Sequence, residues 1–247
     1  MAETPTTAGD GGSPPTLVLV HGAWHGGWSW DPVLPALAAH GVPAHVVDLP
    51  GVGRAPGGHD LAGHAAYLRE EVARLPGPVA LCGHSYGGAV LTEAAPADAV
   101  VLIYLAAFLL RPGESCVDAN AATPPPDDPA LGPHREGDYL HVSPVAARHL
   151  FYDDCPAEPA EAAIARLTPE HVATVGSPVT RAAWTEAPSA YIVTAKDRAI
   201  SPTAQRAMAE RAGRRYEIDS GHSPTLTRPD ELAALLARAI REAAPHG

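Results

Sequence analysis

The segment Gly83-His84-Ser85-Tyr86-Gly87 has the residue pattern of a nucleophilic serine. In this G-x-S-x-G pattern, a sharp turn between a strand and a helix exposes the serine hydroxyl. The turn strains the serine backbone, and the flanking glycines provide the room that it needs. Apolar residues 79–82 before the motif and 89–91 after it fit such a strand and helix. We therefore predict that Ser85 is a nucleophile; an inert serine in a glycine-rich turn is the alternative interpretation.

A serine nucleophile requires a general base and an acidic residue that orients the base. Proteins with this type of turn carry the three residues in the chain order Ser, then Asp or Glu, then His. Asp197 and His222 each follow a short apolar run that is typical of a buried strand. In a parallel sheet, these two side chains would meet Ser85 at one edge. We predict His222 as the base and Asp197 as the acid, in preference to Asp219, which is only three residues from His222.

The negative charge that develops on an attacked carbonyl oxygen requires two N–H donors, which together form an oxyanion hole. One expected donor is the backbone amide of Tyr86, directly after the nucleophile. The other is expected in the glycine-rich loop after the first apolar run, where Ala23 is the first choice and Trp24 the second. Trp24, His25 and Trp28 are also candidate substrate-binding residues, with packing of the tryptophans in the core as the alternative.

Six short apolar runs separated by helical patterns predict an α/β fold with a mostly parallel sheet of about six strands. The pattern at 61–75 indicates a helix with Asp60 as its N-cap, and 232–240 indicates a final helix. Helices are therefore expected on both faces of the sheet. The predicted strands are Leu17–Val20, Ala44–Val47, Val79–Cys82, Val100–Leu105, Ala190–Thr194 and Arg215–Ile218.

Residues 111–181 interrupt this alternation. The stretch 123–129 contains four prolines and excludes a regular helix or strand, and short helical patterns follow near 144–150 and 159–167. We predict a small, mainly helical cap over the strand ends, with an irregular surface excursion as the alternative. The predicted organisation is a flexible tail at 1–15, a core at 16–110 and 182–247, and a cap at 111–181.

The formal charge of −11 disfavours binding to nucleic acid and to anionic membranes, and Lys196 is the only lysine. No run is long and apolar enough to span a bilayer, and the first residues do not resemble a secretory signal, so a cytoplasmic protein is expected. The three cysteines, Cys82, Cys116 and Cys155, form no disulfide or zinc pattern. We expect no metal and no cofactor. A homodimer is left open.

Taken together, the motifs resemble those of the plant methylesterase and hydroxynitrile lyase branch of the α/β-hydrolases, including its bacterial esterase relatives. This resemblance implies the α/β-hydrolase fold, the same Ser-His-Asp triad, a small cap and turnover of small esters. The motifs that carry it are Leu17-Val18-Leu19-Val20-His21-Gly22-Ala23-Trp24-His25-Gly26-Gly27-Trp28, Gly83-His84-Ser85-Tyr86-Gly87-Gly88, Tyr191-Ile192-Val193-Thr194-Ala195-Lys196-Asp197 and Ile218-Asp219-Ser220-Gly221-His222-Ser223-Pro224.

Two departures from the family pattern bear on the expected activity. Lyases of this branch carry Thr where this chain has Gly22, and a lysine after the catalytic histidine where it has Ser223. The expected function is therefore hydrolysis of a small carboxylic ester. The alternatives are a lyase, acyl transferase or biosynthetic tailoring enzyme that uses the same site, and a non-catalytic ligand receptor on the same fold. Plant methylesterases tend to have Met at the Ser223 position, so their aromatic methyl-ester specificity does not carry over.

Overall fold

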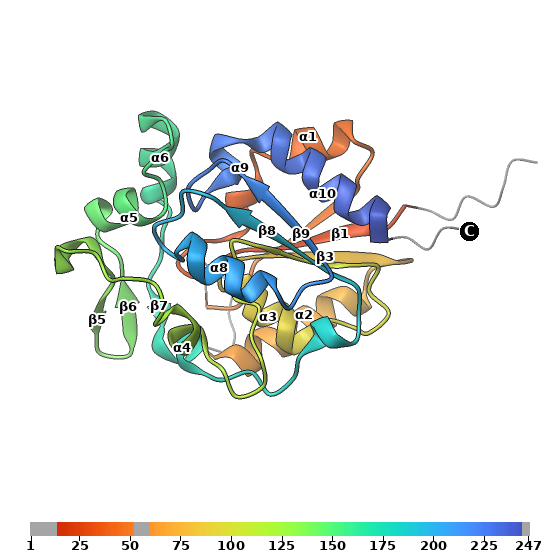
Figure 1. Cartoon of the computed structure of the whole chain (residues 1–247), viewed down its shortest axis with the longest axis horizontal. Coiled ribbons are helices and arrows are strands. Elements are labelled where there is room, and N and C mark those ends of the chain that lie inside the picture. Colours follow the sequence, from red (N-terminus) through yellow and green to blue (C-terminus); the bar gives the residue numbers. More distant parts are fainter. Residues whose placement is uncertain (1–13, 52–59, 244–247) are drawn as a thin grey trace, which may run out of the picture.

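A six-stranded parallel sheet forms the centre of the molecule (Figure 1). The computed structural model describes residues 14–51 and 60–243, so the predicted tail at 1–15 lies almost entirely outside the described residues. The order of the strands is β2-β1-β3-β4-β8-β9, and each neighbouring pair is parallel. All six strands predicted from the sequence are confirmed: β1 Thr16–Val20, β2 Ala44–Val47, β3 Val79–His84, β4 Leu102–Leu105, β8 Ser189–Thr194 and β9 Arg214–Ile218.

Helices cover both faces of this sheet, as the apolar runs predicted. Successive residues of a strand point to opposite faces, so Val18 and Val20 pack in one buried cluster and Leu17 and Leu19 in another. The first cluster lies against α2 Leu61–Ala73, α3 Gly87–Ala94 and α8 Pro202–Ala209. The second lies against α1 Leu34–Ala39 and α10 Pro229–Ala243, which Figure 1 shows on the opposite side from α2 and α3. Shorter helices are η1 Gly27–Trp30, η3 Ala183–Thr185 and α9 Pro224–Thr227.

The N-terminus of α2 shows how local chemistry sets an element boundary. Asp60 has an extended backbone, and its side chain accepts a hydrogen bond from the Gly63 amide at 2.7 Å. This is the N-cap arrangement that the sequence predicted, and it satisfies one of the four free amides at the start of a helix. The helix ends at Ala73, two residues before the end of the predicted range.

The strand order places one reversal between β1 and β3. Strands are added outward from β1 toward β2 on one side and from β3 toward β9 on the other. In open parallel sheets, the crevice beyond the carboxyl ends of two such strands is where ligands bind. Ala23 follows β1 and Ser85 follows β3, so the fold brings the loops that carry them together at this crevice.

Residues 111–181, which we call the cap, contribute no strand to the central sheet. They include helices near both predicted positions and also three strands of two or three residues, which the sequence did not predict. These strands form a small antiparallel sheet in the order β5-β6-β7. The elements of the cap are α4 Cys116–Asn120, η2 Pro129–Leu131, β5 His134–Glu136, β6 Tyr139–His141, α5 Pro144–Leu150, α6 Ala157–Ile164, β7 Glu170–His171 and α7 Val172–Gly176.

The cap has its own small core, which joins the rest of the molecule through aromatic residues. Leu150, Phe151 and Tyr152 form part of a buried cluster that packs against Trp24 and Trp28 from the loop after β1. The cap thereby lies over the carboxyl ends of the strands, at one end of the sheet in Figure 1. Among the described residues, no helix has the length and apolar character required to cross a membrane.

Candidate active site

Ser85 occupies a strained turn between β3 and α3. Its φ is +53°, a left-handed conformation that costs energy for a residue with a side chain. Its amide donates to the Leu105 carbonyl at 3.2 Å, and its carbonyl accepts from the amides of Gly88 (3.0 Å) and Phe108 (3.1 Å). A Cβ at Gly83 would lie 2.5 Å from the Gly87 carbonyl oxygen. The turn therefore requires a glycine at this position, as the motif predicted.

Asp197 and His222 are brought together from the loops after β8 and β9. The Nδ1 of His222 lies 2.7 Å from Oδ2 of Asp197, and both side chains are buried. Because an ionised carboxylate only accepts hydrogen bonds, Nδ1 carries the proton and Nε2 is the free acceptor of the ring. This is the tautomer that a general base requires.

The buried carboxylate of Asp197 is satisfied by four further donors. Its Oδ2 also accepts from the Thr194 hydroxyl and from the Gln205 amide, each at 2.8 Å. Its Oδ1 accepts from the amides of Ala199 (2.7 Å) and Ile200 (2.9 Å). These hydrogen bonds fix the orientation of the carboxylate beside the imidazole.

Asp219, the alternative acid, lies elsewhere. Its exposed carboxylate pairs with Lys196 at 2.8 Å. The structure therefore places Asp197, and not Asp219, against His222. Gln205 and Thr194 were not singled out from the sequence, because their contact with Asp197 depends on how α8 packs against β8.

His84, the residue before Ser85, contacts His222. Its Nε2 donates to the His222 carbonyl at 2.8 Å, and the centres of the two rings are 4.6 Å apart. Burial, and then repulsion from a charged His222, hold the pKa of His84 well below its usual value. His84 is therefore neutral, and a second positive charge does not compete with an imidazolium at His222.

Two backbone amides at the cavity of Ser85 have no acceptor among the described residues. Ala23 and Tyr86 line the same cavity as Ser85, and within residues 14–51 and 60–243 neither amide donates a hydrogen bond to the protein. The amide of Trp24, the second-choice donor, is bound by the carboxylate of Glu170 at 3.0 Å. Of the predicted donors, Ala23 and Tyr86 thus have free amides at this cavity, and Trp24 does not.

The cavity that Ser85 lines has a volume of about 320 Å³ and a mainly apolar wall. Trp24 and Phe108 contribute from the core, whereas Leu140, Leu150 and Phe151 contribute from the cap. The proline-rich stretch, residues 123–126, also lines it, together with Arg198 from the loop after β8. A small apolar ligand would fit beside Ser85 in this space.

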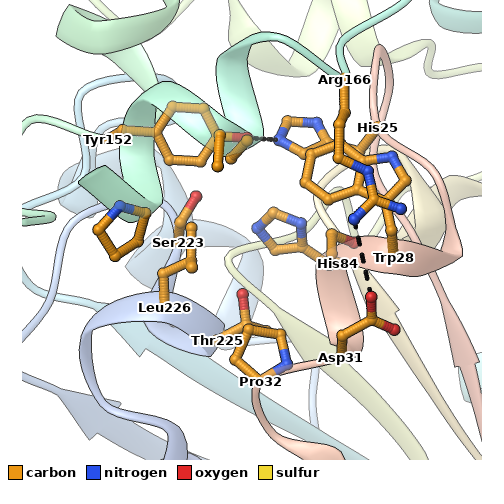
Figure 2. Close-up of a pocket in the computed structure, with 14 residues that line it drawn as sticks. His25, Trp28, Asp31, Pro32, His84, Tyr152, Arg166, Ser223, Thr225 and Leu226 are labelled. Atoms are coloured by element: carbon orange, nitrogen blue, oxygen red, sulfur yellow. Dashed lines mark hydrogen bonds and ion pairs between the residues drawn. The ribbon is translucent and has the colours of Figure 1, made fainter. Parts of the chain in front are cut away.

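His25 and Trp28 line a different cavity, of about 200 Å³, which Figure 2 shows. The ring of His25 is fixed between the Ala23 carbonyl (2.7 Å from Nδ1) and the Tyr152 hydroxyl (2.7 Å from Nε2). Trp28 lies under the guanidinium of Arg166, 4.7 Å from its ring centre. Of the three predicted substrate-binding residues, only Trp24 lines the cavity of Ser85.

Two further histidines of the loop after β1 are held neutral by burial. Burial lowers the pKa of His21 to about 4 and that of His25 to about 3, in spite of their hydrogen bonds to the carbonyls of Gly22 and Ala23. The Nδ1 of His21 lies 2.8 Å from the Gly22 carbonyl, and its Nε2 accepts from the Leu49 amide at 3.0 Å. These side chains fix the loop and do not exchange protons near neutral pH.

The described residues contain no group of three or more His, Cys, Asp or Glu side chains that could hold a metal ion.

A comparison with family models matches residues 17–235 to the alpha/beta hydrolase family. This chain belongs to the alpha/beta hydrolase family. Except for Thr16, the first residue of β1, the match covers the six strands, and it includes the three loops that carry Ser85, Asp197 and His222.

Individual relatives confirm the resemblance to the plant methylesterase branch. The chain is 31% identical to a pyrethroid hydrolase from Sphingobium wenxiniae, over 90% of this chain and 86% of that protein. It is 30% identical to a pheophorbidase from Raphanus sativus, over 94% and 97% of the two chains. Among solved structures, a methylesterase protein MES16 from Arabidopsis matches with a TM-score of 0.75 and 27% identity, over 92% and 99% of the chains.

Proposed function

We propose that this alpha/beta hydrolase cleaves a small carboxylic ester, with Ser85 as nucleophile, His222 as general base and Asp197 as the orienting acid. The observation that carries the proposal is the buried 2.7 Å contact between His222 and a carboxylate that holds four other hydrogen bonds. It sets the imidazole in the tautomer that can take a proton from serine. The names of the relatives, which include methylesterases, a pheophorbidase and a pyrethroid hydrolase, support an ester as substrate.

In the first half-reaction, the hydroxyl oxygen of Ser85 attacks the ester carbonyl while Nε2 of His222 takes its proton. The carbonyl oxygen becomes negative and accepts from the amides of Ala23 and Tyr86. The imidazolium is stabilised by Asp197, and it then gives its proton to the departing alkoxide. The products of this step are an alcohol and an acyl group esterified to Ser85.

In the second half-reaction, water replaces the alcohol. His222 removes a proton from the water molecule as its oxygen attacks the acyl carbonyl, and the same two amides hold the negative oxygen. The proton returns from His222 to Ser85 as the acyl group leaves as a carboxylic acid. No group beyond the residues described and one water molecule is needed to balance the cycle.

The residues near His222 favour hydrolysis over the lyase alternative. Lyases of this branch use a lysine directly after the catalytic histidine, whereas this chain has Ser223 there, which is buried and lines the cavity of Figure 2. Lys196, the only lysine in the sequence, pairs with Asp219 on the surface. A cationic group that could stabilise a leaving anion is therefore missing at this position.

The test is hydrolysis of p-nitrophenyl esters from acetate to octanoate at pH 7.5, with wild type, Ser85→Ala and a control, Ser177→Ala. Ser177 lies at the end of α7, and its hydroxyl is no part of the site. We expect turnover by wild type and the control, and a loss of about 10⁶-fold in Ser85→Ala. Wild-type protein that is folded and turns over no ester would contradict the proposal, as would full activity of Ser85→Ala. The acyl chain length that gives the highest turnover would show how long an acyl group the 320 Å³ cavity accepts.

A further inference from the structure

The loop after β1 has a hydrogen-bond partner for almost every backbone polar group near Ala23. The Gly22 carbonyl accepts from His21 Nδ1 (2.8 Å) and from the His25 amide (3.3 Å). The Ala23 carbonyl accepts from His25 Nδ1, and the Trp24 carbonyl accepts from the Thr168 amide at 3.0 Å. The amide of Trp24 donates to Glu170. The amide of Ala23 has no acceptor among the described residues, and Ala23 lines the same cavity as Ser85.

Glu170 reaches this loop from the cap. It lies in β7 at the edge of the small antiparallel sheet, opposite Leu140. Its side chain is almost fully buried, with an exposed fraction of 4%, and Oε2 is 3.0 Å from the Trp24 amide nitrogen. A buried carboxylate is costly unless it is hydrogen-bonded, so its position here calls for an explanation.

Trp24 is the residue of the loop that most needs to be held. Its φ is +62°, in the left-handed region that residues with side chains rarely occupy. Such a conformation persists only where the surroundings fix it. Three bonds from the cap do so: Glu170 binds its amide, Thr168 binds its carbonyl, and its indole Nε1 donates to the Leu140 carbonyl at 2.9 Å.

We propose that Glu170 is a positioning residue of the oxyanion hole, which acts by accepting the hydrogen bond of the Trp24 amide and so fixes the direction of the Ala23 amide. This inference rests on the proposed function, since it assumes that the Ala23 amide binds the oxyanion of an ester substrate. It makes the cap part of the catalytic apparatus in addition to its role as a wall of the cavity.

The physical reason is the peptide group between Ala23 and Trp24. Glu170 holds its N–H end, and His25 Nδ1 holds its C=O end. Without Glu170 the N–H is a buried donor with no partner, and rotation of this peptide group would relieve that cost. The rotation would displace the backbone of Ala23, and a displacement of about 1 Å at a catalytic group costs on the order of 10²-fold in rate.

The experiment compares Glu170→Gln with Glu170→Met. Glutamine keeps an acceptor oxygen at the end of the side chain and removes the charge, whereas methionine keeps the length and removes the acceptor. Glu114→Ala serves as the control for stability alone, because Glu114 pairs with Arg211 (2.6 Å) at the start of the cap and is not among the residues that line the cavity of Ser85. Thermal unfolding, kcat and KM for the best p-nitrophenyl ester, and the rate of labelling by a fluorophosphonate are measured for each variant.

The labelling rate reports the oxyanion hole without ester turnover. Ser85 attacks phosphorus, fluoride leaves, His222 takes the serine proton, and the phosphonyl oxygen occupies the place of the oxyanion. We expect Glu170→Met to lower kcat and the labelling rate by about 10- to 100-fold, with KM changed less than about threefold. Glu170→Gln should stay within about fivefold of wild type, because it retains the acceptor. Glu114→Ala should unfold at lower temperature and label at the wild-type rate.

Two results would overturn the inference. One is Glu170→Met with a lower unfolding temperature and an unchanged labelling rate, which would make Glu170 a structural residue only. The other is Glu170→Gln as slow as Glu170→Met, which would show that the charge and not the acceptor matters. If Glu170→Met does not fold, Glu170→Asp replaces it, because aspartate keeps the charge and shortens the reach; equal labelling of the Asp and Gln variants would overturn the inference.

The two proposals fail separately. A wild-type protein that is labelled at Ser85 and turns over no ester would refute the proposed function, and the labelling rates of the variants would still decide the role of Glu170. A wild-type protein that is not labelled has no oxyanion hole beside a nucleophile, and that result would overturn both.

Discussion

The acid of the proposed triad illustrates how environment separates two similar residues. Asp197 and Asp219 each follow a strand of the sheet, Asp197 directly after Lys196 and Asp219 three residues before His222. Five donors surround the carboxylate of Asp197, whereas Asp219 makes an exposed ion pair with Lys196. Exposed pairs of this kind contribute little to stability, so Asp219 is free to vary and Asp197 is not.

Replacement of these two residues by asparagine is therefore expected to give opposite results. Asp197→Asn should lower kcat by about 10⁴-fold, because a neutral side chain at this position favours the wrong tautomer of His222 and does not stabilise its charged form. Asp219→Asn is the matched control and should retain full activity. Ester hydrolysis by both variants at pH 7.5 is the measurement. A large loss of activity in Asp219→Asn would contradict the assignment of Asp197 as the orienting acid.

At the scale of elements, the turn that carries Ser85 depends on close backbone contact. A Cβ at Gly83 would overlap the Gly87 carbonyl, whereas a Cβ at Gly176 in α7 would meet nothing within 4 Å. We expect Gly83→Ala to lose activity and to lower the free energy of unfolding by about 1–3 kcal/mol, because the backbone must shift to relieve the overlap. Gly176→Ala should be neutral or slightly stabilising. Calorimetry and activity of the two variants test this difference.

A second cap carboxylate binds the loop of His222, the proposed general base. Oδ2 of Asp154 accepts from the Gly221 amide at 2.6 Å, directly before His222. Asp154→Ala should leave that amide without this acceptor, cost about 1–3 kcal/mol of stability and lower kcat more than it raises KM. Glu161, exposed on the last turn of α6, provides a control in Glu161→Ala. Equal kcat in the two variants would show that Asp154 does not position His222.

Particular residues show how far the sequence could predict these elements. The six strands were predictable because strands buried on both faces are continuous apolar runs, and Asp197 and His222 could be identified because each follows such a strand. The sheet β5-β6-β7 was not predicted, since its strands have only two or three residues, half of them exposed, and no alternating pattern. His25 and Trp28 were predicted as substrate-binding residues from their place in the loop that carries Ala23, but both side chains line another cavity. Glu170 and Asp154 gave no signal, because their contacts join segments 146 and 67 residues apart in sequence.

At the scale of the whole molecule, buried neutral histidines link stability to pH. Burial holds the pKa of His21 near 4 and that of His25 near 3, against 6.5 when exposed. Below pH 6.5 the unfolded chain therefore binds protons that the folded chain does not, so stability is full above pH 6.5 and falls as the pH is lowered toward 4. Each such histidine contributes a slope of about 1.4 kcal/mol per pH unit. Burial raises the pKa of Glu170 and that of Asp153, so these two carboxyl groups favour the folded state as the pH is lowered.

A comparison of variants isolates one of these histidines. His25→Asn keeps a donor for the Ala23 carbonyl and removes the titrating ring, so its free energy of unfolding should fall less steeply between pH 6.5 and 4.5 than that of wild type, by about 1.4 kcal/mol per pH unit. His134 is exposed on β5, and His134→Gln should keep the wild-type slope. Urea unfolding at four pH values measures the slopes. A steeper slope in His25→Asn would contradict the assigned direction of the pKa shift.

The bonds between cap and core also limit how this protein can be recombined. Glu170 binds the loop after β1, Asp153 pairs with Arg198 (3.0 Å) in the loop after β8, and Asp154 binds the loop after β9. A chimera that takes its cap from a relative with another substrate would gain different cavity-lining residues from that cap. It would also lose all three of these contacts between cap and core. Transfer of substrate preference between members of the family would succeed only when each acidic residue of the cap is moved together with the core loop that it binds. The cap and these core loops must therefore be exchanged together.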